Sequence, residues 1–238
     1  MKFFVQELDD KFINNTIISL RRMGHEVLSR PISDDLYRTY YKFKFDHAIF
    51  VSSLFNMEIA QFISEFHSKD IKFFIYHNEK EINLDILTHF NQACTNLSLI
   101  KHKQCIQIPS LVNDYIYVNT KKKKRDHISC FIDQLDNIPE ELEEHLYPNS
   151  KLKIRLFNNH RIKHHQNLGM LNEFTKPEIL NESEYFLSID NYYSNEALNC
   201  GCKVISISDL KNLKSKTKIK NSKKKTTTYK NFIESNLI

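Results

Sequence analysis

The sequence predicts an α/β protein made of two consecutive Rossmann-like units, each built on a parallel sheet. Short apolar runs of strand length alternate with amphipathic helical segments along most of the 238 residues. A basic block at 121–125 interrupts this alternation, which starts again at residue 127. A chain of this length is enough for one large domain or two small ones, and the interruption favours two.

Apolar runs of strand length mark the first unit, and a further helix and strand share residues 85–100. The expected strands are 2–8, 25–32, 46–53, 71–77 and 105–112. The helix expected over 10–24 has apolar side chains spaced for one face, Asp9–Asp10 at its start and Gly24 at the C′ position. A second amphipathic helix is expected over 55–70.

The second unit repeats this alternation. Its expected strands are 127–133, 151–157, 184–190 and 202–208, and its expected helices are 138–148, 176–183 and 195–200. Pro139 and Pro177 stand near the starts of the first two helices. A proline suits that position, because its missing N–H would have no intrahelical partner there.

These elements predict four segments. We expect an N-terminal Rossmann-like domain over 1–120, a basic linker over 121–126 and a C-terminal Rossmann-like domain over 127–209. Residues 210–238 are expected to form a basic tail, and its last residues, TYKNFIESNLI, have the pattern of a terminal helix.

The net charge of +5 is concentrated in two places. Residues 121–125 are all basic, and residues 211–225 contain eight lysines without an acidic residue. Such runs are either solvated linkers and tails or contacts to an anionic membrane or a polyanionic substrate. Nucleic acid is not an expected partner, because no nucleic-acid-binding motif accompanies the basic runs.

Composition excludes several classes of protein. No apolar run approaches the roughly 20 residues of a transmembrane helix, and the start MKFFVQELDD becomes acidic too soon for a secretory signal. The five cysteines are odd in number and scattered, and Cys200–Cys202 lacks the spacing and the second pair of a zinc site. We therefore expect reduced thiols in a cytoplasmic protein.

Polar residues that follow the expected strands are the candidate site, because ligands of open parallel sheets bind at the carboxyl ends of the strands. In chain order the candidates are Asp9, Asp10, His77, Asn158, Arg161, Lys163, Asp190, Ser194, Asn195 and Glu196. Each type also has a structural interpretation. In that interpretation, the aspartates cap the first helix, the histidine is satisfied within the fold, and the polar loop at 158–167 is solvated.

The stretch SNEALNCGCKVIS, residues 194–206, combines a helix start, a glycine stop and a β-branched run. We expect Ser194 to cap a helix whose first backbone N–H groups favour a phosphate. Glu196, just inside this helix, is suited to accept hydrogen bonds from two adjacent ribose hydroxyls. A plain helix that starts at Ser194 and stops at Gly201 explains the same residues.

Residues 167–206 resemble the donor-binding segment of GT-B glycosyltransferases. That family has an "E-A-x-x-x-G-x-x-V-I" element, which Glu196, Ala197, Gly201, Val204 and Ile205 match. In the first unit, IKFFIYHNE resembles the strand ending in a histidine that lines the family's active site. CIQIPSLVND resembles the family's strand and turn after it. The resemblance spans about residues 1–206 and implies a GT-B-like fold with two units facing a central cleft.

The resemblance implies a glycosyltransferase that moves a sugar from a nucleotide-activated donor to a glycan or lipid-linked acceptor, with no bound metal or other cofactor. It implies a role in cell-surface polysaccharide synthesis and a peripheral place at the inner face of the membrane. Donor binding falls to Glu196, Asn195, Ser194, Asp190, Asn158, Arg161 and Lys163. His77 would contact the reacting sugar or leaving group, and Asp9 or Asp10 would be the base of an inverting enzyme.

The chain also departs from the family pattern. Ser188 stands where the family has the first of two glutamates, and the Gly-rich loop after the first strand is missing. These departures favour an alternative, a non-catalytic GT-B-like protein that binds a glycan or nucleotide. Another kind of Rossmann-type protein is a further alternative, although the sequence has no G-x-G-x-x-G fingerprint of a dehydrogenase.

Overall fold

A computed structural model shows two compact units. It describes residues 1–31, 35–67, 69–79, 84–87, 89–95, 104–122, 125–133, 135–146, 152, 154–157, 164, 167–189, 192–214 and 227–238. Unit 1 contains Met1–Leu111 and Thr227–Ile238, and unit 2 contains Val112–Thr226. The prediction differs from this division, because it placed the first boundary near residue 120 and kept the C-terminal segment apart from the N-terminal domain.

Unit 1 is built on a six-stranded sheet with the order β2-β1-β3-β4-β5-β6, in which every pairing is parallel. The strands are β1 (Lys2–Gln6), β2 (Glu26–Arg30), β3 (His47–Val51), β4 (Lys72–His77), β5 (Gln92–Thr95) and β6 (Cys105–Gln107). β3 is buried at all five positions. A strand covered on both faces must be largely apolar, which explains the hydrophobic run at 48–51 after His47.

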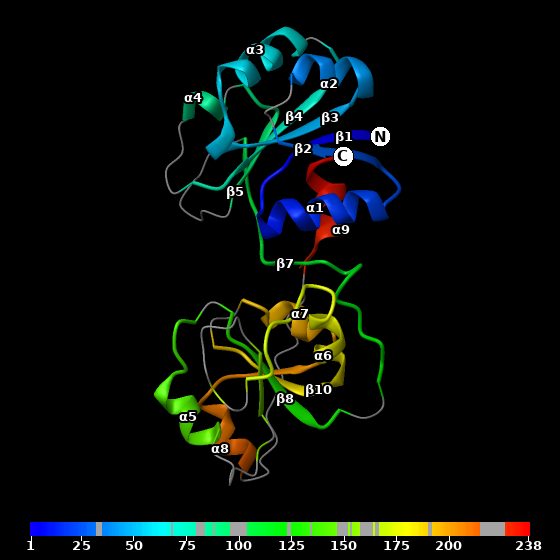
Figure 1. Ribbon diagram of the computed structural model, residues 1–238. Coiled ribbons are helices and arrows are strands. Elements are labelled where there is room, and N and C mark those ends of the chain that lie inside the picture. Colours follow the sequence, from blue (N-terminus) through cyan, green and yellow to red (C-terminus); the bar gives the residue numbers. More distant parts are fainter. Residues whose placement is uncertain are drawn as a thin grey trace. The chain divides into compact units, whose positions relative to one another are not determined.

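Helices cover both faces of this sheet (Figure 1). One face packs against α2 (Leu36–Phe43), α3 (Met57–Phe66) and α4 (Leu84–Leu87), and the other packs against α1 (Lys11–Arg22). Successive side chains of a strand point to opposite faces of the sheet. In β4, Phe73 and Ile75 therefore face α2, α3 and α4, and Phe74 and Tyr76 face α1. The short 3₁₀ helix η1 (Ser52–Leu54) follows β3.

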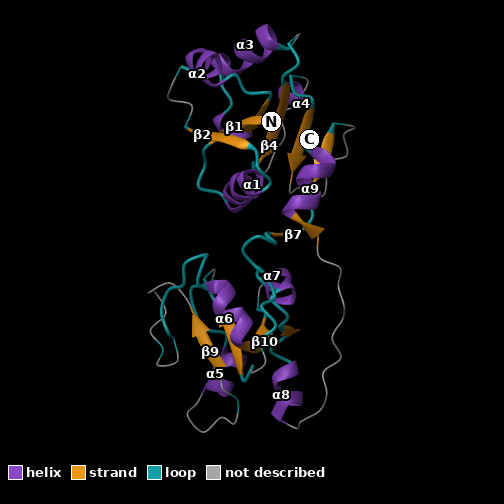
Figure 2. Cartoon of the chain, turned by 90° about the vertical axis from the view of Figure 1, so that its right-hand side faces the viewer, coloured by secondary structure: helices purple, strands orange, loops and turns teal. Residues whose placement is uncertain are grey.

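The C-terminal helix α9 (Tyr229–Asn236) belongs to unit 1, where it lies beside α1 (Figure 2). Its Tyr229, Phe232 and Ile233 are buried in the same core cluster as Phe12 of α1. The rings of Phe12 and Phe232 meet edge to face with centroids 6.0 Å apart. The predicted terminal helix is therefore present, and its apolar face completes one side of the unit 1 core.

Unit 2 is built on a four-stranded parallel sheet with the order β11-β10-β8-β9. The strands are β8 (His127–Phe131), β9 (Ile154–Phe157), β10 (Ser183–Leu187) and β11 (Lys203–Ile205). Its helices are α5 (Glu140–Leu146), α6 (Lys176–Glu182), α7 (Ser194–Asn199) and α8 (Asp209–Lys214). Outside this sheet, β7 (Leu111–Val112) pairs with β12 (Thr227–Thr228).

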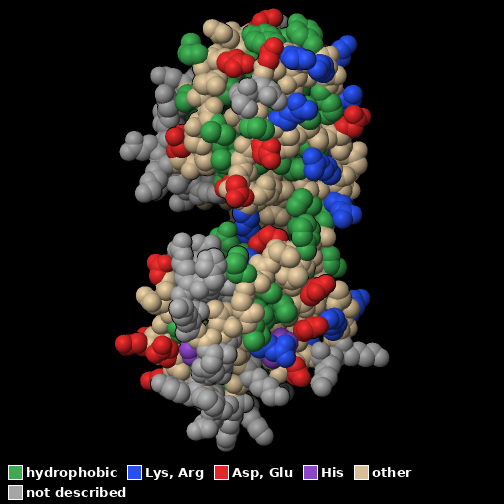
Figure 3. Space-filling view, in the orientation of Figure 1, with side chains coloured by type: hydrophobic (Ala, Val, Ile, Leu, Met, Phe, Trp, Pro, Cys, Tyr) green, Lys and Arg blue, Asp and Glu red, His purple; other side chains and the backbone are tan. Residues whose placement is uncertain are grey.

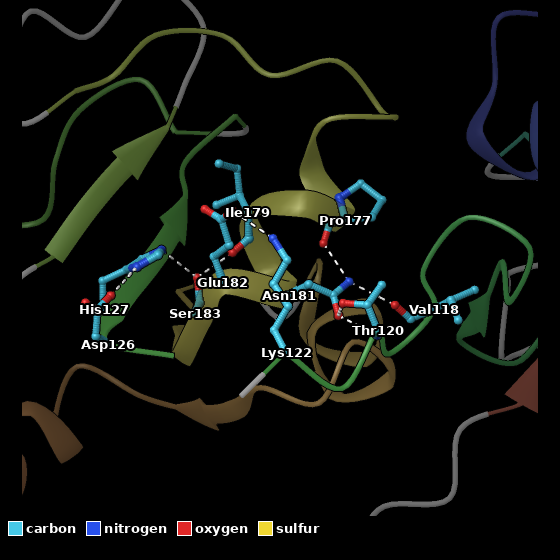
Figure 4. A network of polar contacts seen from close by, with 10 residues as sticks. All are labelled: Val118, Thr120, Lys122, Asp126, His127, Pro177, Ile179, Asn181, Glu182 and Ser183. Carbon is cyan, nitrogen blue, oxygen red and sulfur yellow. Dashed lines mark hydrogen bonds and ion pairs between the residues drawn. The ribbon is translucent and has the colours of Figure 1, made fainter. Parts of the chain in front are cut away.

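The segment before β8 is packed on unit 2, although the sequence predicted a linker over 121–126. Asn181 at the end of α6 accepts hydrogen bonds from the N–H and the hydroxyl of Thr120 and donates to the carbonyl groups of Val118 and Pro177 (Figure 4). Lys122 forms an ion pair with Glu182. Because Asn181 is buried with both amide atoms satisfied, it fixes residues 118–120 to α6.

Most predicted elements are present, but the helices α2 and α8 were not predicted. α2 lies between the second and third predicted strands, where the sequence analysis expected no element. It is short, and only Leu36 and Thr39 among its described residues are fully buried. The expected reduced thiols are confirmed, because all five cysteines are free.

The charged side chains of unit 1 are mixed in sign over the face that Figure 3 presents. In unit 2, acidic side chains gather over α5, whose first turn carries Glu140, Glu141 and Glu143. This placement suits the helix dipole, which favours negative charge near the helix start. The lysines at 215–225 lie outside the described residues.

Gly201 ends α7 in a conformation and a space that exclude other residues. Its φ is +89°, and a Cβ atom there would lie 2.4 Å from the side-chain nitrogen of Asn119. Moving the Asn119 side chain away would cost free energy, because its Oδ1 accepts hydrogen bonds from Arg125 and from the Lys121 N–H. Gly24 has a similar φ of +87°, but no atom lies within 4 Å of the Cβ position.

These two glycines provide a matched prediction. Gly24→Ala should cost about 1 kcal/mol of unfolding free energy through backbone strain alone. Gly201→Ala should cost roughly 1–2 kcal/mol more, because the hydrogen bonds of Asn119 must also be broken or displaced. Urea unfolding of both variants measures the difference. Equal losses would contradict the proposed role of the Asn119 contact.

His47 is a buried histidine at the start of β3. Its ring stacks on Phe3 at 4.7 Å between centroids, and neither ring nitrogen has a hydrogen-bond partner in the described part of the chain. Burial, aided by the positive charge of Lys72, lowers the pKa of His47 to about 4. The folded protein therefore holds His47 neutral at pH values where the unfolded chain binds a proton.

This shift predicts the direction of the stability change with pH. The folded-state pKa lies below the ordinary 6.5, so the stabilising effect is complete above pH 6.5 and is lost as pH falls toward 4. At pH 5 the wild type should have lost about 2 kcal/mol through this group. His47→Phe should remove this part of the pH dependence, whereas His67→Phe at an exposed position should not. If the urea midpoints of wild type and both variants changed with pH in the same way, His47 would not be the source of this pH dependence.

Candidate functional site

The strand order places a switch point in the sheet of unit 1 between β1 and β3. The chain leaves β1 for β2 on one side and returns to β3 on the other, and ligands of such sheets bind at the carboxyl ends beside this point. Gln6 ends β1, is buried, and accepts a hydrogen bond of 2.8 Å from the N–H of Val51. Ser52, which follows β3, donates to Asn78 beyond β4 at 3.1 Å.

Asp10 lies at this edge as the N-cap of α1. Its Oδ1 accepts hydrogen bonds from the N–H groups of Phe12 at 2.7 Å and Ile13 at 3.2 Å. The capping role expected for this residue is therefore confirmed. Asp9 is exposed, and its carboxylate has a longer contact of 3.4 Å with the Asn14 side chain.

His77 ends β4, as the sequence predicted, and its side chain is 3% exposed. Burial lowers its pKa, against the opposing effects of the Glu79 charge and a hydrogen bond to the Glu79 backbone. Its Nε2 has no hydrogen-bond partner in the described part of the chain. A buried ring nitrogen without a partner is costly, which distinguishes His77 from a histidine fully satisfied by the fold.

The sheet of unit 2 has its own switch point, between β8 and β10. The chain passes from β8 to β9 on one side and then to β10 on the other. Asp133 follows β8, and Ser188 follows β10, so both stand at the carboxyl ends beside this point. Ser188 is the residue that stands in place of the first glutamate of the family motif.

The start of α7 differs from its prediction in one respect. Ser194 is the first helical residue rather than the N-cap, which is Tyr193, and Tyr193 makes no side-chain capping bond. The Ser194 hydroxyl instead lies 2.7 Å from that of Ser188. The predicted cap was wrong because a nearby hydroxyl outcompetes the backbone N–H groups for this side chain.

Glu196 lies in the first turn of α7 and is 3% exposed. Its buried position is unusual for a carboxylate and needs compensating contacts, which Glu196 has. Asn195 beside it is half-buried. Gly201 ends α7 and β11 follows, as predicted. The remaining donor-side candidates, Asp190, Asn158, Arg161 and Lys163, lie outside the described residues.

A cluster of polar groups that the sequence analysis missed surrounds the buried Lys176 at the start of α6. The ammonium group lies 2.9 Å from an Asp133 carboxylate oxygen and 2.7 Å from one of Glu173, and it also donates to the Tyr193 hydroxyl. Tyr193 donates to Glu173 at 3.2 Å, and the Tyr117 hydroxyl donates to the same carboxylate at 2.8 Å. Sequence gave no signal for these contacts, because their partners come from four separate segments.

The ionisation of this cluster follows from its contacts. Burial opposes a charged Lys176, but the hydrogen bonds and charges of Glu173 and Asp133 dominate and raise its pKa. Burial likewise opposes a charged Glu173, while Lys176 and the two tyrosine hydroxyls lower its pKa. The two shifts agree, so Lys176 is protonated and Glu173 is ionised at neutral pH. Burial and the Glu173 charge raise the pKa of Tyr117 and Tyr193, which stay neutral.

Large apolar side chains are exposed in the loops at this edge of unit 2. Phe174, beside Glu173, is 70% exposed, and Tyr192, beside Tyr193, is 41% exposed. The rings of Tyr192 and Tyr193 meet edge to face with centroids 4.9 Å apart. Leu168 and Met170, in the segment that follows β9, are also exposed. Exposed apolar groups near polar side chains are typical of ligand-binding surfaces.

A separate cavity of about 330 Å³ lies at the other end of the unit 2 strands, where the strands begin. It is lined by Asp126, His127, Ile128, Leu152, Glu184, Tyr185 and Leu213. His127 is buried there, with Nε2 3.1 Å from the Ser183 hydroxyl and Nδ1 3.3 Å from Asp126 (Figure 4). Because these residues lie at the amino ends of β8 and β10, this cavity is not part of the candidate site.

No protein-family model matches the sequence, and a comparison with curated proteins finds no significant match. Among solved structures, a putative UDP-N-acetylglucosamine 2-epimerase from Listeria monocytogenes has a TM-score of 0.50 at 8% identity, covering 99% of this chain and 87% of that one. MnaA of S. aureus, solved with UDP, has a TM-score of 0.46 at 11% identity, with the same coverage. MurG of Acinetobacter baumannii has a TM-score of 0.40 at 8% identity, covering 90% of each chain.

The chain has a GT-B-like fold. Its two Rossmann-like units with parallel sheets are those that the sequence predicted, and the Listeria structure shares this fold over nearly the whole chain. An identity of 8% shows the fold alone. The cleft expected between the units stays a prediction. None of the described helices is both long and apolar enough to cross a membrane.

Proposed function

We propose that this protein is a GT-B-like glycosyltransferase that moves a sugar from a nucleotide-activated donor to a glycan or lipid-linked acceptor in polysaccharide synthesis. The observation that carries the proposal is the β10–α7–β11 segment of unit 2. It places Glu196 in the first turn of a helix at the carboxyl edge of a parallel sheet, within a GT-B-like fold. The matching family element binds the ribose of the donor through this glutamate.

The proposed donor is a nucleotide sugar, and the nucleotide binds to unit 2. Sugar transfer leaves negative charge on the departing diphosphate, which needs hydrogen-bond donors or cations nearby. We propose that Ser194, Asn195, Arg161 and Lys163 donate these hydrogen bonds or supply the positive charge. Asp190 and Asn158 are further proposed residues of the nucleotide-sugar site. No metal or other cofactor is part of this proposal.

In unit 1, His77 is proposed to contact the reacting sugar or the leaving group. Its buried Nε2, without a partner in the described part of the chain, supports this role. If the enzyme inverts, a base must take the proton of the acceptor hydroxyl. The capping bonds of Asp10 commit one of its oxygens, so Asp9 is the better candidate for that base.

The second candidate function is a GT-B-like protein that binds a nucleotide or glycan without catalysis. Ser188 supports this alternative, because its hydroxyl bonds Ser194 where the family has a carboxylate. Either function retains nucleotide binding in unit 2. An anionic membrane surface contacted by the lysines at 211–225 completes the proposal, because a lipid-linked acceptor lies at such a surface.

A ligand panel tests nucleotide binding directly. Thermal shifts would be measured with UDP, GDP, ADP and CDP and with the matching monophosphates. UDP is the first probe, because the similar Listeria structure is that of a putative UDP-N-acetylglucosamine 2-epimerase. A selective shift with one base supports the proposal, and release of that nucleotide from its sugar conjugate separates the transferase from the non-catalytic alternative. No shift with any nucleotide would overturn both.

Glu196→Gln should weaken binding of the nucleotide that the panel identifies by about 1–3 kcal/mol, the range for a lost charge-assisted hydrogen bond. The melting temperature should change little, because the amide keeps the shape of the side chain. Glu184→Gln is the control, since Glu184 lies at the opposite edge of the same sheet. Titration calorimetry measures all three affinities, and equal values for wild type and Glu196→Gln would contradict the ribose assignment.

His77→Ala should reduce turnover of the matching nucleotide sugar at least about tenfold, within the range of a lost acid–base or leaving-group contact. Nucleotide affinity should be unchanged, because His77 belongs to unit 1. His89→Ala, at an exposed position of the same unit, is the control. Unchanged turnover in a folded His77→Ala variant would return His77 to a structural role.

A further inference from the structure

Lys176 occupies an unusual place for a lysine. It is 5% exposed, it begins α6, and its ammonium group lies beside Asp133 at the switch point of the unit 2 sheet. Lysine is rarely buried unless it is paired, so the position needs an explanation. The sequence predicted nothing for this residue beyond membership of a short helix.

The ammonium group is fully occupied by the protein. Lysine has three N–H donors, and those of Lys176 have three acceptors, Asp133, Glu173 and the Tyr193 hydroxyl. Two of these three partners are carboxylates. Lys176 is thus poorly suited to hold a phosphate directly, because an added anion would compete with carboxylates already in place.

The three partners belong to three different loops. Asp133 follows β8, Glu173 precedes α6, and Tyr193 directly precedes α7. The Lys176 side chain therefore connects three segments of the chain. Asp133 and Glu173 are 40 residues apart in the sequence, and Glu173 and Tyr193 are 20 residues apart. The tie is reinforced by Tyr193 and Tyr117, which both donate to Glu173.

We propose that Lys176 is a positioning residue that holds the α7 start, with Glu196, against the loops after β8 and before α6. Tyr193 is the last residue before the helix that carries Ser194 and Glu196, so fixing its hydroxyl fixes the start of that helix. The same tie holds the backbone beside the exposed Phe174 and Tyr192. This inference rests on the proposed nucleotide site of unit 2.

Four variants test the tie. Lys176→Met keeps the length of the side chain and removes its charge, and Tyr193→Phe removes only the hydroxyl while keeping the ring packed on Phe131. Asn181→Ala is the stability control, since it breaks a buried hydrogen-bond centre at the other end of α6. Lys203→Met is the charge control, because Lys203 pairs with Glu184 and lies over Tyr185 at the opposite edge of the sheet.

UDP affinity and amide hydrogen exchange are measured for each protein. We expect Lys176→Met to weaken UDP binding about tenfold and Tyr193→Phe about threefold, as loss of several buried hydrogen bonds and of one would do. Their effects should not add in the double variant, because both break the same tie. Both should raise exchange at residues 171–175 and 192–196 without ligand. Asn181→Ala and Lys203→Met should leave UDP affinity and exchange in these segments unchanged.

The outcomes separate this inference from the proposed function. If wild type does not bind UDP, affinity is measured with the nucleotide that the panel identifies. If wild type binds none of them, the nucleotide assignment fails, and the exchange data still test whether Lys176 orders the two loops. If exchange rises but UDP affinity does not fall, Lys176 has only a structural role. If Asn181→Ala weakens UDP binding as much as Lys176→Met, general instability explains both. If the Lys176→Met variant does not fold, the UDP affinity and hydrogen exchange of Tyr193→Phe alone decide whether the inference holds.

Discussion

Burial of both faces of a parallel sheet is the constraint on which this structure depends. Helices cover the two faces of the unit 1 sheet, so strands such as β3 are apolar at nearly every position. Polar side chains are then confined to the strand ends and the loops that follow them. This explains why His77, Asp9 and Asp10 were found by asking which residues come after an apolar run. The polar residues that can carry chemistry therefore lie outside the apolar core, at the ends of the strands.

The same constraint explains which parts of the structure could be predicted from sequence. β4 and the α1 cap at Asp10 depend on residues within a few positions of each other, so the local pattern determines them. α2 was missed because it spans only eight residues, so its apolar pattern repeats over little more than two turns. The cap of α7 was wrong because Ser188, six residues earlier, binds the Ser194 hydroxyl. The contacts of Lys176 were not predicted, because its partners come together only when β8, α6 and α7 pack in the fold.

The C-terminal helix shows a further limit of local reasoning. The apolar positions of α9 predicted a helix, but only the fold shows where that helix is buried. Phe232 and Ile233 complete the core on the α1 face of unit 1, more than 200 positions away from Phe12 in the sequence. The boundary that the sequence analysis placed near residue 120 followed a change in composition. The contacts of Asn181 with Val118 and Thr120 instead make that stretch part of unit 2.

The two edges of the unit 2 sheet use buried polar groups differently. At the amino edge, the Ser183 hydroxyl donates to the Ile179 carbonyl and lies within hydrogen-bond distance of His127, so the contacts join β8 to the end of α6. At the carboxyl edge, Lys176 joins loops rather than regular elements. Strand ends and helices are already ordered by the core, whereas loops gain order mainly from such contacts. An ion cluster around a buried lysine contributes little net stability compared with apolar packing, so its value at this edge is geometric. It fixes the loop before α7 in advance, and a preorganised site binds its ligand without bearing the entropy cost of ordering that loop.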